Sequence, residues 1–176
     1  MRTISIERLR ELFIYSPETG IIANRVNRRY RATIGMEAGN KTARGYREVK
    51  VGGTSIRAHW IAWALHFGEW PERCLDHING IKDDNRISNL RLATRSENMQ
   101  NCKTKKDNTS GFKGVSWHKG SRRWAVRIQT QGKRRHVGHF SNIEEAARAY
   151  RAAAEKFHGE FANVGGANFR GGAGFA

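Results

Sequence analysis

The sequence has few of the features that mark membrane, secreted or zinc-cluster proteins. Its two cysteines, Cys74 and Cys102, form no CxxC pair, so neither a disulfide framework nor a zinc cluster is expected. No run approaches the roughly 18 consecutive apolar residues that a membrane-spanning helix needs. The opening residues, MRTISIERLRELF, carry charges throughout, so no secretory signal is expected. We therefore expect a cytoplasmic protein in a reducing compartment.

Acidic side chains are also scarce. The chain has 16 Asp and Glu against 32 Lys and Arg among its 176 residues, a formal net charge of +16. Such an excess favours a polyanionic partner. With no membrane segment expected, nucleic acid is the partner that the charge predicts. Aromatic residues make up 10% of the chain, including five Trp, which excludes a disordered basic tail.

The charge is unevenly spread and suggests two modules. Residues 1–101 hold 17 basic and 11 acidic side chains, whereas residues 102–176 hold 15 and 5. The polar, basic run 102–109 is typical of a linker. We predict a first module over residues 1–101, a second over 110–164, and a flexible Gly-rich tail over 165–176. Lys103, Lys105 and Lys106 of the linker are candidate phosphate contacts.

The first module begins with short elements. We predict a short helix with Leu9, Leu12 and Phe13 on its apolar face, ended by the turn residues 16–20. Strands are expected at 21–25, 46–51 and 54–57, and a helix at 59–67. His59 and His66 lie on that apolar helix, and we interpret both as packing residues rather than ligands.

Residues 75–101, LDHINGIKDDNRISNLRLATRSENMQN, carry the strongest chemical signal. Asp76 and His77 fall in a short strand, and the Asx-rich residues 83–85 are interpreted as a turn. Asn89 precedes a second strand at 90–93. A capping box over 94–97 then starts a helix with Asn98 in its first turn. The pattern predicts a hairpin followed by a helix, centred on residues 73–101.

These residue types suit phosphodiester hydrolysis. Mg²⁺ prefers oxygen ligands and commonly takes one or two protein groups together with phosphate and water. The Asp76 carboxylate and the Asn98 carbonyl supply such oxygens. His77, with an ordinary pKa near 6.5, is the natural general base at neutral pH.

Asp76, His77, Asn89 and Asn98 resemble the motif of the HNH endonucleases, specifically the phage-type homing nucleases. The likeness covers roughly residues 40–101. It implies a ββα-metal fold, Mg²⁺ or Mn²⁺ held by Asp76 and Asn98, His77 as base, and Asn89 bracing the loop so that His77 points correctly. Asn98 stands where the commonest pattern has His, which leaves a thinner ligand set than a tightly held Zn²⁺ requires. The resemblance also points to a phage-infected or prokaryotic host cell.

The second module has a simpler pattern. Strands are expected at 112–117, 123–129 and 134–140, separated by Gly-containing turns. A capping box led by Ser141 then starts a helix that runs to about His158 and ends at Gly159. The fold class predicted for the whole chain is therefore α+β, with a ββα unit followed by a three-stranded antiparallel sheet packed on one helix.

The segments GFKGVSW (111–117), RWAVRIQ (123–129), VGHF (137–140) and EEAARAY (144–150) resemble an AP2 domain. The resemblance implies that the sheet lies in the DNA major groove. Alternation directs Trp124, Val126 and Ile128 towards the helix and directs Arg127 and Gln129 outward. The first hairpin, 116–123, differs from the plant proteins, and His136 replaces the family's Trp, so the target sequence does not transfer. The candidate DNA-binding residues are Trp117, Arg122, Arg123, Arg127, Gln129, Lys133, Arg134 and His136.

Together these patterns predict a metal-dependent endonuclease that hydrolyses duplex DNA and is targeted by an AP2-like sheet. The main alternative is a DNA-binding regulator with a catalytically silent HNH scaffold. An RNA-binding or packaging protein would explain the charge but not the set Asp76, His77 and Asn98. Double-stranded DNA is the expected partner, and no obligatory protein partner is inferred.

Overall fold

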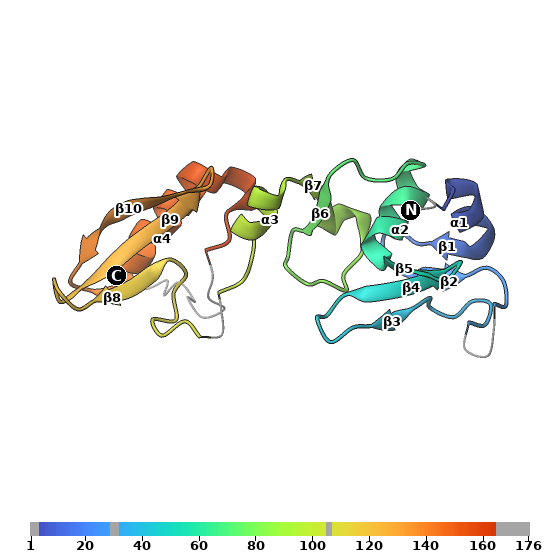
Figure 1. Cartoon of the computed structure of the whole chain (residues 1–176), viewed down its shortest axis with the longest axis horizontal. Coiled ribbons are helices and arrows are strands. Elements are labelled where there is room, and N and C mark those ends of the chain that lie inside the picture. Colours follow the sequence, from blue (N-terminus) through green and yellow to red (C-terminus); the bar gives the residue numbers. More distant parts are fainter. Residues whose placement is uncertain (1–3, 29–31, 105–106, 165–176) are drawn as a thin grey trace, which may run out of the picture. The chain divides into compact units, whose positions relative to one another are not determined.

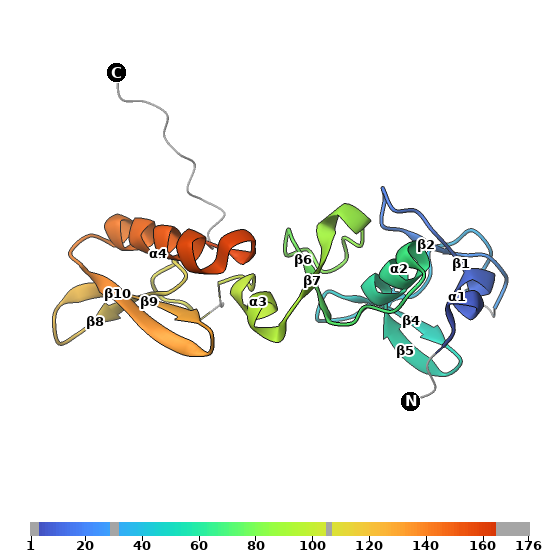
Figure 2. The same ribbon diagram turned by 90° about the horizontal axis from the view of Figure 1, so that it is seen from above.

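The computed structural model describes residues 4–28, 32–104 and 107–164. They form two compact units, Met1–Thr94 and Arg95–Ala176 (Figures 1 and 2). Lys105, Lys106 and the tail 165–176 lie outside the described residues. The division falls seven residues before the predicted one and groups the helix at 95–100 with the second unit.

The first unit opens with helix α1 (Ile6–Leu12), capped by Ser5, whose hydroxyl accepts a hydrogen bond from the Arg8 amide at 3.2 Å. Leu9 and Leu12 are buried as predicted. Phe13 is not helical, contrary to the prediction: its backbone is extended, and it begins strand β1 (Phe13–Tyr15). β1 pairs antiparallel with β2 (Ile22–Asn24), so the turn at 16–20 joins two strands instead of ending a helix.

A three-stranded antiparallel sheet follows, with order β3 (Asn40–Lys41), β4 (Arg47–Val51) and β5 (Thr54–Arg57). Helix α2 (Ala58–Phe67) packs against β4 and β5 and ends at Gly68, whose positive φ of 79° allows its amide to bond the Ala64 carbonyl. The predicted strands and helix here agree with the structure to within two residues, whereas β1 and β3 were not predicted. The core of this unit includes Leu9, Phe13, Ile22, Val49 and Ile61.

The unit ends in the predicted hairpin. Strand β6 (Cys74–His77) pairs antiparallel with β7 (Leu90–Ala93), and the short 3₁₀ turn η1 (Ile87–Asn89) precedes β7. The register places Asp76 opposite Arg91 and His77 opposite Leu90. A loop of residues 78–86 therefore lies between the two strands, directly after His77.

The second unit begins with helix α3 (Arg95–Gln100) and contains a sheet of order β10-β9-β8. These strands span Val115–His118 (β8), Arg123–Thr130 (β9) and Lys133–Phe140 (β10). Helix α4 (Ile143–His158) lies along one face of the sheet, and the 3₁₀ turn η2 (Gly159–Phe161) follows it (Figure 2). The predicted α+β class, with a hairpin module followed by a sheet on one helix, is confirmed.

One detail of α4 differs from the prediction. Asn142, not Ser141, caps the helix, because its side-chain oxygen accepts from the amides of Glu144 at 2.7 Å and Glu145 at 3.4 Å. Val115, Val126, Ile128, Ala146 and Tyr150 are buried between sheet and helix. Among the described residues, no helix is long and apolar enough to span a bilayer.

Candidate active site and nucleic-acid interface

The β6–β7 hairpin holds Asp76 as a buried anion. Asp76 is 4% exposed, and Arg91 stands opposite it in the ladder. Oδ2 of Asp76 accepts hydrogen bonds from Arg91 Nη2 at 2.8 Å and Nε at 3.0 Å. Directly opposed residues of an antiparallel pair lie side by side on one face, which explains why the two meet. The ion pair fixes the direction of the carboxylate.

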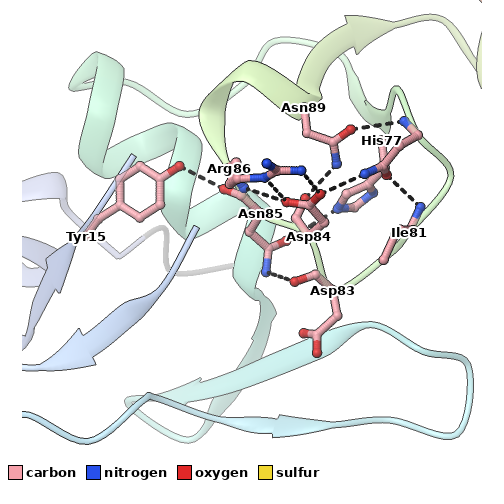
Figure 3. Close-up of polar contacts among 9 residues, drawn as sticks. Tyr15, His77, Ile81, Asp83, Asp84, Asn85, Arg86 and Asn89 are labelled. Atoms are coloured by element: carbon pink, nitrogen blue, oxygen red, sulfur yellow. Dashed lines mark hydrogen bonds and ion pairs between the residues drawn. The ribbon is translucent and has the colours of Figure 1, made fainter. Parts of the chain in front are cut away.

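His77, the next residue along β6, has different neighbours. Its ring lies 4.9 Å, edge to face, from the ring of His59 on α2 and 6.1 Å from that of Tyr46. Its Nε2 atom is 3.3 Å from Oδ1 of Asn85 (Figure 3). Asn85 Nδ2 bonds the carbonyl of Asp83 at 3.4 Å, which sets the orientation of the amide. Because an amide oxygen only accepts, Nε2 carries the proton and Nδ1 is the basic nitrogen.

Burial decides the charge of both histidines. It lowers the pKa of His77 below its usual 6.5, although the Asn85 hydrogen bond and the charge of Asp76 act in the opposite direction. It lowers the pKa of His59 to about 3, helped by neighbouring His77. Both rings are therefore neutral at pH 7. A neutral imidazole is the form that can take a proton. His59 is buried against Tyr46 and His77, whereas His66, which was also interpreted as a packing residue, is exposed.

Asn89 connects the two ends of the loop at 78–86. Its Oδ1 accepts from the Asn79 amide at 3.0 Å, and its Nδ2 donates to the Asp84 carbonyl at 2.8 Å (Figure 3). The side chain is buried. Two bonds from one side chain to the start and end of a loop restrict its conformations, so Asn89 has the geometry of a brace.

The loop carboxylates have protein partners. Asp84 accepts from Arg86 and from Asn79, and the Arg86 bonds lower its pKa to about 2. Asp83 forms ion pairs with Arg47 at 3.1 Å and with Lys41 at 3.4 Å. These contacts shape the loop and attach it to the β3–β4 hairpin, in agreement with the interpretation of this segment as a turn.

The N-terminal strands also support this loop. The Tyr15 hydroxyl donates to the Asn85 carbonyl at 2.8 Å, and burial raises the pKa of Tyr15 to about 12 (Figure 3). The Ile87 amide donates to the Pro17 carbonyl at 3.1 Å. Gly20 has φ +76°, and a Cβ there would lie 2.4 Å from the Arg86 nitrogen. Sequence reasoning missed Tyr15 and the orienting role of Asn85, since both contacts join segments that are remote in the chain or were read as a turn.

The predicted cation ligands fall in different units. Asp76 is on β6, and Asn98 is on α3 of the second unit, so their pairing remains a prediction from the sequence. Within residues 4–28, 32–104 and 107–164, no three His, Cys, Asp or Glu side chains are grouped so that they could hold an ion. Mg²⁺ does not require such a group, because it commonly binds one or two protein oxygens together with substrate phosphate. The donors Asp76 and Asn98 fit that chemistry.

The second unit presents a basic face on the side of its sheet away from α4. Arg127 and Gln129 alternate with the buried Val126 and Ile128, as predicted. In the register of β9 and β10, His136 is opposite Arg127 and Arg134 is opposite Gln129, so the four side chains share one face. Arg123 belongs to the same face by alternation. We call Arg123, Arg127, Gln129, Arg134 and His136 the basic sheet face.

Three predicted DNA contacts lie elsewhere. Trp117 shares a side of β8 with the buried Val115 and packs edge to face on Trp124 at 5.1 Å, so it is on the α4 side. Lys133 is opposite the buried Thr130, and Arg122 lies in the β8–β9 turn with φ +48°. Strand alternation, applied to β8 and β10 as it was to β9, would have separated Trp117 and Lys133 from the basic sheet face.

Two histidines join the basic sheet face and were not predicted. His139 is opposite Ala125, and its ring lies 4.6 Å from that of His136 and 5.2 Å from that of His118. A register shift between His136 and Gly138 brings His139 to this side. Partial desolvation at the sheet surface, followed by the nearby His136 and His118, lowers the pKa of the exposed His139. Simple alternation cannot place His139, because the bulge changes the parity of β10.

Two family models match the chain, one on each side of the run 102–109. Residues 57–100 match the family model for HNH endonucleases, and residues 110–160 match that for the AP2 domain. The first match contains Asp76, His77, Asn89 and Asn98, and the second contains the whole basic sheet face.

Two known proteins are similar to this chain. Protein 3.8 of Escherichia phage T7 is 38% identical over 107 residues, which cover 60% of this chain and 88% of that protein. A solved structure, reported as DNA binding and cleavage by the HNH homing endonuclease I-HmuI, matches over 90% of this chain and 91% of its own, at 19% identity and a TM-score of 0.40.

Proposed function

Since the chain belongs to the HNH endonucleases that carry an AP2 domain, we propose that it hydrolyses duplex DNA with a bound Mg²⁺ or Mn²⁺ ion. In this proposal His77 is the general base, and the AP2 unit selects the DNA site. The observation that carries the proposal is the orientation of His77 by Asn85 beside the buried Asp76 anion.

The chemistry of His77 follows from its surroundings. With Nε2–H directed at Asn85 Oδ1, Nδ1 is the atom that accepts the proton of the attacking water. Burial lowers the pKa of His77, so the ring is neutral at pH 7 and able to act. Asn89 and Tyr15 keep the loop in place, and so maintain Asn85 at the correct side of the imidazole.

Asp76 and Asn98 are the proposed cation ligands. A carboxylate and an amide carbonyl are oxygen donors of the kind that Mg²⁺ and Mn²⁺ accept. The Arg91 ion pair supports this role for Asp76, because it fixes the direction of the carboxylate. When bound, the cation would stabilise negative charge on the scissile phosphate and on the leaving oxygen.

The basic sheet face is the proposed DNA-reading surface. Arg side chains read guanine, and Gln reads adenine, through paired hydrogen bonds to base edges in the major groove. Arg127, Gln129 and Arg134 stand on neighbouring strands of a sheet that is covered on its other side by α4. The arrangement leaves these side chains available to DNA.

The test is cleavage of long duplex DNA by the purified full chain. EDTA should abolish cleavage, and Mg²⁺ or Mn²⁺ should restore it. His77→Ala should lower the rate by about 10²–10⁴-fold with DNA affinity retained, which is the usual loss for a general base. Asp76→Ala should reduce the rate more than Asn98→Ala, because it removes a charge as well as a ligand. His66→Ala, an exposed histidine on α2, is the matched control.

Two results would contradict the proposal. Full activity in EDTA would exclude a hard-cation site, and full activity of His77→Ala would remove this residue from the mechanism. DNA binding without any cleavage under all metal conditions would favour the alternative, a DNA-binding regulator with a silent HNH scaffold.

A further inference from the structure

Helix α3 carries Asn98 but contributes little to its own stability. It is six residues long, and none of its side chains is buried. Helices this short do not persist in water by themselves. A cavity of about 150 Å³ lies beside it, lined in part by Ser96, Met99 and Gln100. Contacts from the rest of its unit therefore help to position α3.

Lys113 makes two of those contacts. Its Nζ atom donates to the backbone carbonyl of Gln100 at 2.6 Å and to that of Cys102 at 2.7 Å. The side chain is half-buried, and this burial lowers the pKa of its ammonium group. A cation at the carbonyl end of a helix is favoured by both hydrogen bonding and the helix dipole.

Asn163 binds the carbonyl of Asn101, which lies between the carbonyls of Gln100 and Cys102 that Lys113 binds. Its Nδ2 donates to the Asn101 carbonyl at 2.7 Å and contacts Asn101 Oδ1 at 3.2 Å. The preceding turn η2 also packs against α3. Three successive carbonyls at the end of α3 thus bind side chains from the beginning and the end of the AP2 unit.

Lys113 is itself attached to the DNA-reading strand. Its neighbour Gly114 has φ +71°, and a Cβ there would lie 2.2 Å from the ring of Tyr150, so the segment is packed closely on α4. The Gly114 carbonyl accepts from the amide of Arg127 at 2.9 Å. Lys113 therefore binds the end of α3, and the next residue, Gly114, binds strand β9 at Arg127 of the basic sheet face.

We infer that Lys113 and Asn163 are positioning residues for DNA cleavage: they hold the end of α3 and so orient Asn98, which makes the AP2 unit part of the catalytic apparatus as well as the DNA-binding element. This inference rests on the proposed role of Asn98 as a cation ligand. It assigns Lys113 to the helix end and not to a DNA phosphate.

The experiment measures cleavage by the full chain as a function of Mg²⁺ concentration, together with DNA affinity in EDTA. Loss of an outer partner of a metal ligand typically costs about 10–100-fold in metal affinity or activity. Lys113→Met should therefore raise the Mg²⁺ concentration for half-maximal cleavage, or lower the maximal rate, by about 10-fold or more. DNA affinity should change by less than about 2-fold, and Lys113→Arg, which keeps a cationic donor, should recover most of the activity.

Two further variants make the result interpretable. Lys156→Met removes the same charge from the surface of α4 and should leave the Mg²⁺ dependence unchanged. Asn163→Leu removes the hydrogen bond to the Asn101 carbonyl without changing the charge of the protein, and should change the Mg²⁺ dependence as Lys113→Met does. It therefore tests the inference even if Lys113→Met folds poorly. A circular dichroism spectrum and a sharp unfolding transition establish that each variant is folded.

The possible failures are distinguishable. If Asn98→Ala leaves the Mg²⁺ requirement unchanged, the proposed ligand role is wrong. If Asn98→Ala changes it but folded Lys113→Met and Asn163→Leu do not, the inference is overturned and the ligand role stands. If Lys113→Met weakens DNA binding with an unchanged Mg²⁺ requirement, Lys113 is a phosphate contact, which also overturns the inference.

Discussion

The imidazole of His77 and the amide of Asn85 face each other across the hairpin loop, with Nε2 and Oδ1 3.3 Å apart. The same Asn85 residue accepts the Tyr15 hydroxyl bond through its backbone carbonyl. The orientation of the proposed base thus depends on a residue 62 positions earlier in the chain. Loop, strand β1 and base form one connected arrangement.

Replacing Asn85 tests that arrangement. Leu has the branched shape of Asn, although it is larger, and it offers no acceptor to Nε2. In Asn85→Leu the imidazole therefore loses its fixed tautomer and direction. Small misplacements of a catalytic group cost about 10²-fold, and we expect a loss of that order in cleavage rate with unchanged DNA affinity. A single-turnover assay at saturating enzyme measures it. Wild-type rates in a folded Asn85→Leu protein would show that His77 does not need this partner.

Gly20 tests the support from the N-terminal strands. Gly20→Ala places a Cβ 2.4 Å from the Arg86 backbone nitrogen, at a residue whose φ is +76°. Gly35→Ala is the matched control, because its φ is +81° but no atom lies within 4 Å of the added Cβ. The control should cost about 1–2 kcal/mol of unfolding free energy, the usual price of a left-handed conformation.

Gly20→Ala should cost more than this control, since a backbone clash adds to the same strain. Guanidinium unfolding followed by tryptophan fluorescence compares the two variants. Equal losses would mean that the loop at residue 86 moves away freely, and that its contact with the segment before β2 is unimportant for stability.

The basic sheet face predicts which arginines read DNA. Arg127→Ala and Arg134→Ala should each cost about 1–3 kcal/mol at the cognate site and little on random sequence, if they bond base edges. Arg135→Ala is the control: this side chain lies over the Phe157 ring of α4, with its guanidinium carbon 5.4 Å from the ring centre. Equal losses on all DNA would identify Arg127 and Arg134 as phosphate contacts, whose removal makes the salt dependence shallower.

Buried His59 predicts a pH dependence of stability. Its pKa is about 3 in the folded protein against an ordinary value of 6.5. The unfolded chain therefore binds a proton below about pH 6.5 that the folded protein excludes until about pH 3. The free energy of unfolding is therefore highest above about pH 6.5, where His59 is neutral in both states, and it decreases progressively as the pH falls. At pH 5 the loss should be about 2 kcal/mol relative to pH 7.5.

His59→Phe should remove that part of the pH dependence, because an apolar ring has no proton to bind. Chemical denaturation at pH 5 and pH 7.5 measures the difference for each protein. His66→Phe retains His59 and should behave like the wild type. If His59→Phe kept the full pH dependence, another group would be responsible for it.

Local pattern was enough for most of the fold. Hydrophobic periodicity and turn residues predicted α2, β4, β5, the β6–β7 hairpin and the sheet with its covering helix, because each of these elements is specified by neighbouring residues. Family resemblance supplied the AP2 and HNH architecture. Short elements such as β1 and β3 were not predicted, since two or three residues are too few to show a hydrophobic periodicity. The cap at Asn142 was misplaced by one residue because Ser141 and Asn142 both accept amide bonds readily.

The sequence alone determined the residue types of the proposed site: a carboxylate, an imidazole and two carboxamides, with their order along the chain. Only the tertiary structure decided which contacts orient them. The His77–Asn85 bond, the Tyr15 support and the Asp76–Arg91 ion pair join residues that come together through loop closure and strand register. Likewise, the sequence determined that the sheet is basic, whereas register and the bulge before Gly138 decided that His139 joins Arg127 while Trp117 and Lys133 do not. Which side chains share a face depends on strand pairing, and local sequence does not contain that information.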